Sequence, residues 1–146
     1  MGMGMGMGTG IGVGGVGGVG TEAGETATCT FRRDDRGFVH AVMRTGCEMV
    51  LADAQENVAM TYEVAGRQRT RVLVDMRGVR SQSRDARQYF GGDEAEKVLT
   101  AVALLIGSPV SRVLANFFLR LSPQRIPTAL FTDDTSAVTW LGEQVP

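Results

Sequence analysis

The chain has 146 residues, with 15 basic and 16 acidic side chains and a formal net charge of −1. This length suits one domain that buries a substantial core. The near-neutral charge argues against a nucleic-acid-binding protein, which would need a strong positive field. Its apolar runs are shorter than the roughly 18–20 residues of a membrane span. We therefore expect a cytoplasmic protein without a transmembrane helix.

The first residues, 1–24, are rich in glycine, which alternates with Met, Ile or Val. Glycine loses more backbone entropy on ordering than any other residue, and the few apolar side chains cannot offset that loss. We expect a disordered tail here and a folded domain over 25–146. Gly12, Gly14 and Gly17 match the dinucleotide-binding pattern GxGxxG, but no strand precedes them, so we predict no cofactor there.

The folded domain opens with a predicted β-hairpin. Two β-compatible runs, 28–33 and 38–43, flank the turn-forming residues 34–37. Helical spacing follows from Val50, and Gly66 provides a stop. The expected inner face of this helix carries Val50, Leu51, Ala54, Val58, Tyr62 and Ala65. Its expected outer face carries Asp53, Glu56, Asn57 and Glu63.

The hairpin also predicts the surroundings of the His and Cys side chains. A turn at Asp35–Arg36 places Cys29 opposite Val42 and His40 opposite Phe31. We therefore interpret His40 as a side chain packed beside the core rather than a general base. The two cysteines are typical of core thiols in a reducing compartment. One His and no closely spaced Cys pair predict that no metal binds.

Strands and helices alternate through the rest of the chain. Short apolar runs predict buried strands at 72–74, 101–106 and 129–131. Helices are expected over 83–90, with a short turn at 93–97, then over 108–121 and from 132 or 133 to 141. The order ββαβαβαβα predicts a single small α/β domain with a mixed, mostly parallel sheet and packed helices.

Three segments resemble the STAS superfamily, the bacterial anti-sigma-factor antagonists and their relatives. They read VLVDMRGV, AVALLIGSPVSRVLANFFLRL and TALFTDDTSAVTWL, and the resemblance covers about residues 27–142. The later two look especially like an uncharacterised STAS/SEC14-like branch. The resemblance implies a STAS-like fold and a non-enzymatic protein-interaction module with a regulatory role. The SEC14-like label implies the alternative, a binder of a lipid or other small apolar ligand.

Antagonists of this superfamily carry a phosphorylatable serine at a helix N-terminus, usually in an Asp-Ser-Ser-Gly-like sequence. The corresponding stretch here is VRSQSRD over 79–85, which lacks that signature. Ser81 and Ser83 lie near the expected place and are the candidate switch residues. Neighbouring arginines and the helix start would favour a phosphate. The simpler interpretation is that Ser83 only caps the helix.

Seven arginines lie between residues 67 and 87, offset by Asp75 and Asp85 alone. Such charges often form a solvated rim, but this density makes the segment the best candidate for contacting an acidic partner protein. The predicted partner-binding residues are Arg77, Arg80, Arg84 and Arg87.

Other kinds of site receive weaker signals. Ligands of α/β sheets collect at the carboxyl ends of strands, where Ser108 at a helix start and Arg112 in its first turn form a candidate anion site. Phe117, Phe118 and Trp140 could line an apolar cavity or simply pack in the core. The apolar stripe from Val110 to Leu121 leaves a homo-oligomer open. No nucleophile-elbow serine or Cys–His pairing is evident, so we predict no catalytic residue and no enzyme.

Overall fold

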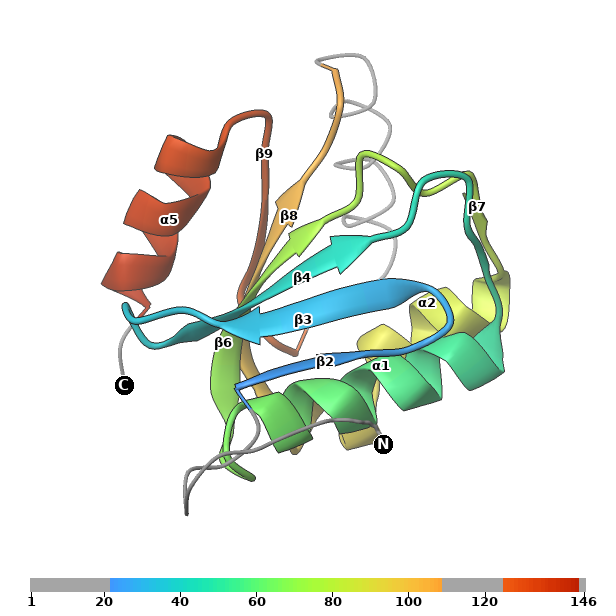
Figure 1. Cartoon of the computed structure of the whole chain (residues 1–146), viewed down its shortest axis with the longest axis horizontal. Helices are drawn as coiled ribbons and strands as arrows, with labels where there is room; N and C mark the ends of the chain where they lie inside the picture. Colours follow the sequence, from blue (N-terminus) through green and yellow to red (C-terminus); the bar gives the residue numbers. More distant parts are fainter. Residues whose placement is uncertain (1–21, 109–124, 145–146) are drawn as a thin grey trace.

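The computed structural model describes residues 22–108 and 125–144. A six-stranded sheet with the order β2-β3-β4-β6-β8-β9 forms its centre (Figure 1). Its strands are β2 (Ala23–Glu25), β3 (Cys29–Arg33), β4 (Phe38–Met43), β6 (Thr70–Asp75), β8 (Leu99–Leu105) and β9 (Thr128–Phe131). The β2–β3 and β3–β4 pairs are antiparallel, and the other three pairs are parallel. This confirms the predicted α/β class and the mixed, mostly parallel sheet.

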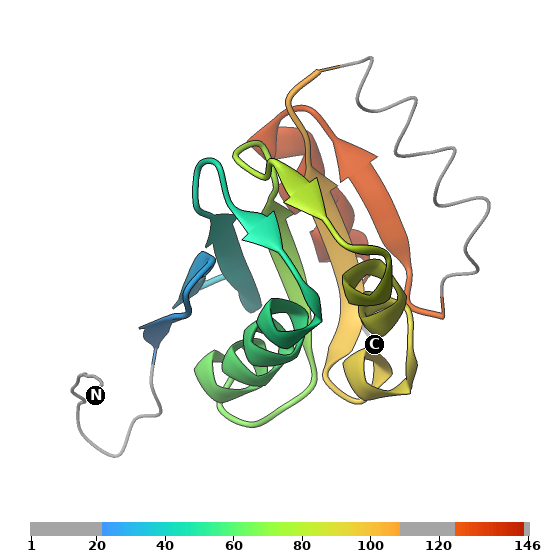
Figure 2. The ribbon, with the colours of Figure 1, turned by 90° about the vertical axis from the view of Figure 1, so that its right-hand side faces the viewer.

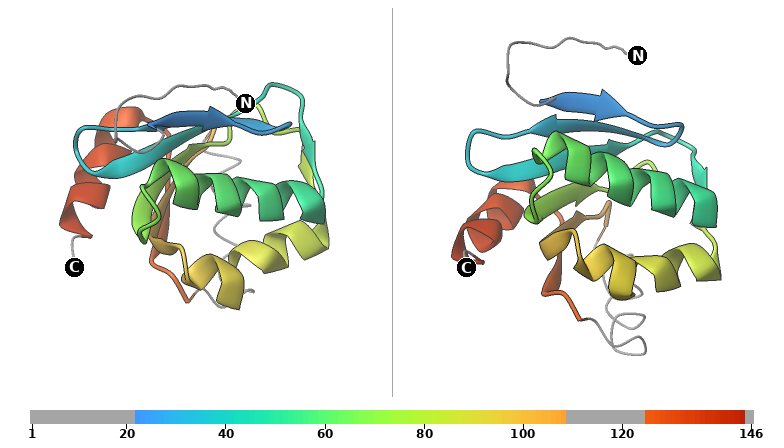
Figure 3. Two further views of the ribbon diagram at one scale, coloured as in Figure 1. Left: turned by 60° about the horizontal axis from the view of Figure 1, so that its bottom comes forward. Right: turned by 90° about the horizontal axis from the view of Figure 1, so that it is seen from below.

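Helices cover both faces of the sheet, as Figures 2 and 3 show. They are α1 (Leu51–Val64), α2 (Arg84–Phe90), α3 (Asp93–Glu96) and α5 (Asp134–Glu143). The first three lie on one face, where Cys29, Val39 and Val64 are fully buried, and α5 lies on the other, where Leu73, Leu105 and Leu141 are. Each buried Leu or Val contributes roughly 1.5–3 kcal/mol of hydrophobic stabilisation. Two separate cores therefore hold the helices to one sheet.

A second, smaller sheet was not predicted. It pairs β5 (Glu48–Met49) in parallel with β7 (Ser81–Gln82). Because α1 follows β5 and α2 follows β7 directly, the N-termini of the two helices start side by side (Figure 2).

The predicted register of the β3–β4 hairpin is wrong by one residue. The amide of Gly37 donates to the carbonyl of Asp34 (3.0 Å), the amide of Asp34 donates to the carbonyl of Phe38 (2.8 Å), and Gly37 has a φ of +92°. This is a three-residue turn closed by a glycine bulge. The extra residue pairs Cys29 with Met43, and His40 with Arg32 rather than Phe31. Since alternate side chains point to opposite faces, His40 lies on the face away from Phe31.

The buried face of α1 also differs from the prediction. Val50 is 53% exposed and Asn57 only 5%. Asn57 Nδ2 donates to Thr28 Oγ1 (3.0 Å), and Asn57 Oδ1 accepts from the Thr26 hydroxyl. An amide can be buried at little cost when its hydrogen bonds are made. The buried residues are Ala54, Asn57, Val58, Thr61 and Val64.

The remaining described elements match the expectations closely. Ser83 caps α2 and Asp133 caps α5, as predicted. Strand β2 begins at Ala23, inside the range assigned to the tail. The helix expected over 108–121 lies outside the described residues from position 109 on. None of the helices in the described ranges is long and apolar enough to cross a membrane.

Candidate functional site

The carboxyl ends of β6, β8 and β9 lie at one edge of the sheet, because these strands are parallel. Asp75 ends β6, Ser108 follows β8 and Asp133 follows β9. Asp133 is committed to structure, since its carboxylate accepts from the amide (2.8 Å) and the hydroxyl (2.9 Å) of Ser136. These bonds lower the pKa of Asp133. Arg112, the other half of the predicted anion site, lies outside the described residues.

The turn after β6 is held by Asp75 and Arg77. The Asp75 carboxylate accepts from the backbone amide of Arg77 (3.1 Å), its Nε (3.0 Å) and its Nη2 (2.7 Å). The hydrogen bond from the guanidinium is the main reason why the pKa of Asp75 is lowered. Arg77 is half-exposed, and its guanidinium is already paired with Asp75 within its own turn.

The end of this turn lies against the loop between β4 and β5. The amide of Gly46 donates to the carbonyl of Gly78 (2.7 Å), and a Cβ on Gly78 would lie 2.9 Å from Thr45 Cα. Further along, the amide of Ser83 donates to the carbonyl of Met49 (2.9 Å). This parallel course brings Val50 beside Ser83, the residue at which α2 begins.

The two candidate switch serines have different surroundings. Ser83 Oγ accepts from the amide of Ala86 (3.3 Å) and donates to the Asp85 carboxylate (2.5 Å). That bond lowers the pKa of Asp85. A phosphate on Ser83 would replace it with repulsion between two negative groups. Ser81 is exposed on β7, and its hydroxyl has no hydrogen-bond partner among the described residues.

Three of the predicted partner-binding arginines flank Ser81 and Ser83 in the sequence. Arg80 is 74% exposed and reaches Glu48 only at 3.8 Å. Arg84 is exposed and has no ion-pair partner within 22–108 and 125–144. Arg87 is exposed, and its Nη1 donates to the carbonyl of Gln82 (3.1 Å). We call Val50, Arg80, Ser81, Arg84 and Arg87 the Val50–arginine patch.

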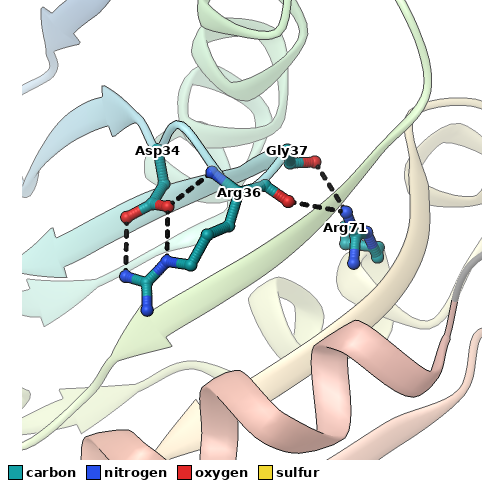
Figure 4. A network of polar contacts seen from close by, with 4 residues as sticks. All are labelled: Asp34, Arg36, Gly37 and Arg71. Atoms are coloured by element: carbon teal, nitrogen blue, oxygen red, sulfur yellow. Dashed lines mark hydrogen bonds and ion pairs between the residues drawn. The ribbon is translucent and has the colours of Figure 1, made fainter.

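The other three arginines of the run lie at the opposite end of β6. Arg71 Nη1 donates to the carbonyl of Leu141 at the end of α5 (2.7 Å), and its Nη2 donates to the carbonyls of Arg36 (3.1 Å) and Gly37 (3.2 Å) (Figure 4). Arg69 donates to the carbonyl of Leu99 (3.2 Å), and Arg67 pairs with Glu63 on α1 (3.3 Å). The run of seven arginines is thus divided between two ends of the sheet.

Hollows beside β2 carry charged side chains in their lining. One, of about 540 Å³, includes Arg32, Arg33, Asp34 and Asp35 in its lining. Trp140, a predicted lining residue for an apolar ligand, packs against Phe131 with ring centroids 5.8 Å apart. Phe117 and Phe118 lie outside the described residues. The described part of the chain therefore adds no support for an apolar ligand.

Neither cysteine is an activated nucleophile. Burial raises the pKa of Cys29 to about 12 and also raises the pKa of Cys47. Both thiols are therefore protonated near neutral pH, in agreement with a role in packing. In the described ranges, no three His, Cys, Asp or Glu side chains come together as a group that could hold a metal ion.

A solved structure supports the fold assignment. It is an uncharacterised protein of the DUF3478 family with a SpoIIAA-like fold from Shewanella loihica PV-4. It aligns at a TM-score of 0.52 and 13% identity, over 77% of this chain and 91% of that one. The SpoIIAA-like fold is the STAS fold, so the predicted resemblance is confirmed at the level of architecture.

The remaining comparisons lead to one family model. A protein with unknown function from Arthrobacter sp. FB24 is 32% identical over 84% of this chain and 95% of that chain, with a TM-score of 0.28. No curated protein matches the sequence. The model of a domain of unknown function, DUF7793, matches residues 32–145. The chain is therefore a member of the DUF7793 family.

Proposed function

We propose that this domain is a non-enzymatic, regulatory protein-interaction module that binds an acidic protein surface through the Val50–arginine patch. The observation that carries the proposal is the exposure of Val50, at 53%, beside the start of α2, a helix that carries two exposed arginines. Interfaces commonly combine an apolar centre with a polar rim, and arginine is enriched in them. Val50 would be the apolar anchor, and Arg80 and Arg84 would pair with carboxylates of the partner.

The state of the polar groups near the site favours binding over catalysis. Asp75 and Asp133 are held by hydrogen bonds within their own turns. The thiol pKa values are raised, which disfavours a thiolate nucleophile. We therefore propose that the domain acts by contact alone.

Ser81 is the better candidate for a switch. A phosphate there would add roughly −1.5 to −2 charges beside Arg80 and Arg84. It would neutralise the patch and weaken binding of an acidic partner. Ser81→Asp should therefore lower partner capture, whereas Ser81→Ala should leave it unchanged. Equal capture by both variants would remove Ser81 from the proposal.

The interaction is tested by affinity capture from native cell lysate with the tagged full-length protein. The double variant Arg80→Glu with Arg84→Glu should lose the captured partner. The matched control is Arg67→Glu with Lys97→Glu, which changes the charge equally at the other end of the sheet, where both side chains are about 70% exposed. Circular dichroism checks that both variants fold. Undiminished capture by the first variant would overturn the proposal.

A further inference from the structure

A groove runs between the edge strand β2 and helix α1, away from the Val50–arginine patch. Its volume is about 300 Å³. Three of its six lining residues are glutamates and none of the six is basic, while Arg44 pairs with the carboxylate of Glu25 (2.8 Å). The lining residues are Glu25, Thr26, Glu56, Ala59, Met60 and Glu63.

One backbone edge of β2 has no neighbouring strand among the described residues, as Figure 3 shows. The amide of Arg33 donates to the carbonyl of Glu22 (2.7 Å), and the amide of Thr26 donates to the carbonyl of Cys29 (2.9 Å). Bonded residues alternate along an antiparallel strand. The backbone groups of Ala23 and Glu25 therefore point outward from the sheet, where an added strand would pair with them.

Gly24 makes room for a side chain on the α1 side of this edge. A Cβ on Gly24 would lie 2.5 Å from Met60 Sδ and 3.4 Å from Val64 Cγ2, so β2 lies directly over α1 here. In an added strand, the residue opposite Gly24 would point to the same face as Gly24. An apolar side chain at that position would rest on Met60 and Ala59.

Carboxylates lie on either side of the apolar surface that Ala59 and Met60 form on α1. Glu56 and Glu63 are exposed and lie on the same side of α1, seven residues apart. Glu63 also forms an exposed ion pair with Arg67 (3.3 Å), and such pairs are weak enough for a basic group of a partner to compete. Glu56 lies near the carboxyl end of β2, because its neighbour Asn57 bonds to Thr26, the residue after β2. Side chains two positions before and after the apolar residue would also point toward α1. Basic residues at those positions would face the two carboxylates.

We propose that the β2 edge binds an extended segment of a partner protein whose α1-facing side chains run basic, apolar, basic. The segment adds to the sheet as a strand, so its backbone supplies affinity and its alternate side chains supply specificity. This site differs in place and in charge from the Val50–arginine patch, and neither depends on the other.

The test uses the full-length protein and a blocked synthetic peptide, Thr-Lys-Thr-Val-Thr-Lys-Thr. Two-dimensional NMR should show the largest shifts at the amides of Ala23 and Glu25, with slower hydrogen exchange there. A peptide with Glu in place of Lys should bind at least about tenfold more weakly. Equal binding of the two peptides, or shifts confined to other elements, would overturn the proposal.

Variants separate the two parts of the site. Glu56→Lys with Glu63→Lys should lower peptide affinity at least about tenfold, and the matched control Glu94→Lys with Glu143→Lys should not. Ala23→Pro removes the outward amide without touching a bond to β3, and should weaken binding about fivefold or more. If these amides are already protected in the protein without peptide, the edge is occupied by its own chain or a second copy, and the proposal fails. Sedimentation then distinguishes those two occupants.

Discussion

The same four-residue pattern, Asp-x-Arg-Gly, occurs at two opposite ends of the sheet, and its two copies have different neighbours. One copy is the β3–β4 turn over 34–37, and the other, 75–78, follows β6. In the first, the Asp34 carboxylate accepts from the amide (2.8 Å), Nε (2.8 Å) and Nη2 (2.9 Å) of Arg36 (Figure 4). Asp75 and Arg77 make the same set of bonds. The local chemistry of the two turns is therefore equivalent.

The difference lies in the neighbours of each turn. The first is joined to the rest of the fold by Arg71, which bonds both to its carbonyls and to the end of α5. The second lies against the loop before α1 and leads into the exposed Val50–arginine patch. Their glycines differ as well: Gly37 has a positive φ, whereas Gly78 permits a close backbone approach. Identical local motifs are thus joined to the fold in different ways, by a side chain at one end and by a close backbone approach at the other.

Gly78→Ala should have the largest effect on stability. Its Cβ would lie 2.9 Å from Thr45 Cα and 3.1 Å from Thr45 N, and these backbone atoms cannot rotate away. We expect a loss of about 3 kcal/mol in the free energy of unfolding, measured by urea denaturation. A loss below about 1 kcal/mol would mean that the two loops separate easily.

Arg71→Met should cost about 2 kcal/mol, because it removes charged donors from three carbonyl groups. Arg77→Met is the comparison in the other turn and should cost at most about 1 kcal/mol, since Arg77 is 51% exposed and pairs only with its own turn. Urea denaturation of both variants measures the difference. Equal losses would contradict the inference that Arg71 joins the first turn to the fold while Arg77 holds only its own turn.

Gly37→Ala should cost roughly 1–2 kcal/mol, because a residue with a side chain is strained at a φ of +92°. Gly37→Asn should recover part of that loss, since asparagine tolerates positive φ better. At Gly78 the order should reverse, because the larger Asn side chain meets the same backbone of Thr45. Thermal unfolding of the four variants tests whether the order of stability of the Ala and Asn variants reverses between the two positions.

Acid should weaken the first turn only at low pH. The guanidinium of Arg36 lowers the pKa of Asp34 from 3.8 to about 2. A depressed folded-state pKa gives stability that is present above about pH 4 and is lost as the pH falls toward 2. Asp34→Asn should therefore flatten the pH dependence of unfolding in that window. A carboxyl NMR titration of Asp34 with an ordinary midpoint would contradict the interpretation.

Sequence reasoning predicted the elements better than their relative placement. The division of the seven arginines was missed because Arg71 and Arg77 are close in the chain. A strand advances about 3.3 Å per residue, so β6 carries them roughly 20 Å apart, to opposite edges. Proximity in sequence is therefore a poor guide to a shared surface when a strand lies between.

Other misses have equally local causes. The bulge at Gly37 adds one residue to the turn, and a one-residue change reverses the face of every side chain in register. Asn57 was placed outside because its partners, Thr26 and Thr28, come from a distant segment. Strands β5 and β7 have two residues each, too few for any periodic signal. The short apolar runs of β6, β8 and β9 and the capping residue Ser83 carried strong signals and were predicted correctly. For α5, Asp133 is the cap among the two residues considered, Thr132 and Asp133.

The bond from Arg71 to Leu141 also has a consequence for how the chain folds. It links residues 70 positions apart, and the same guanidinium holds the first turn of the domain. The bond to α5 and the bonds to the hairpin turn share one guanidinium, so each helps to hold Arg71 in place for the other. Amide hydrogens of α5 and of the hairpin should therefore exchange with solvent as one cooperative unit, although the two elements lie far apart in the sequence.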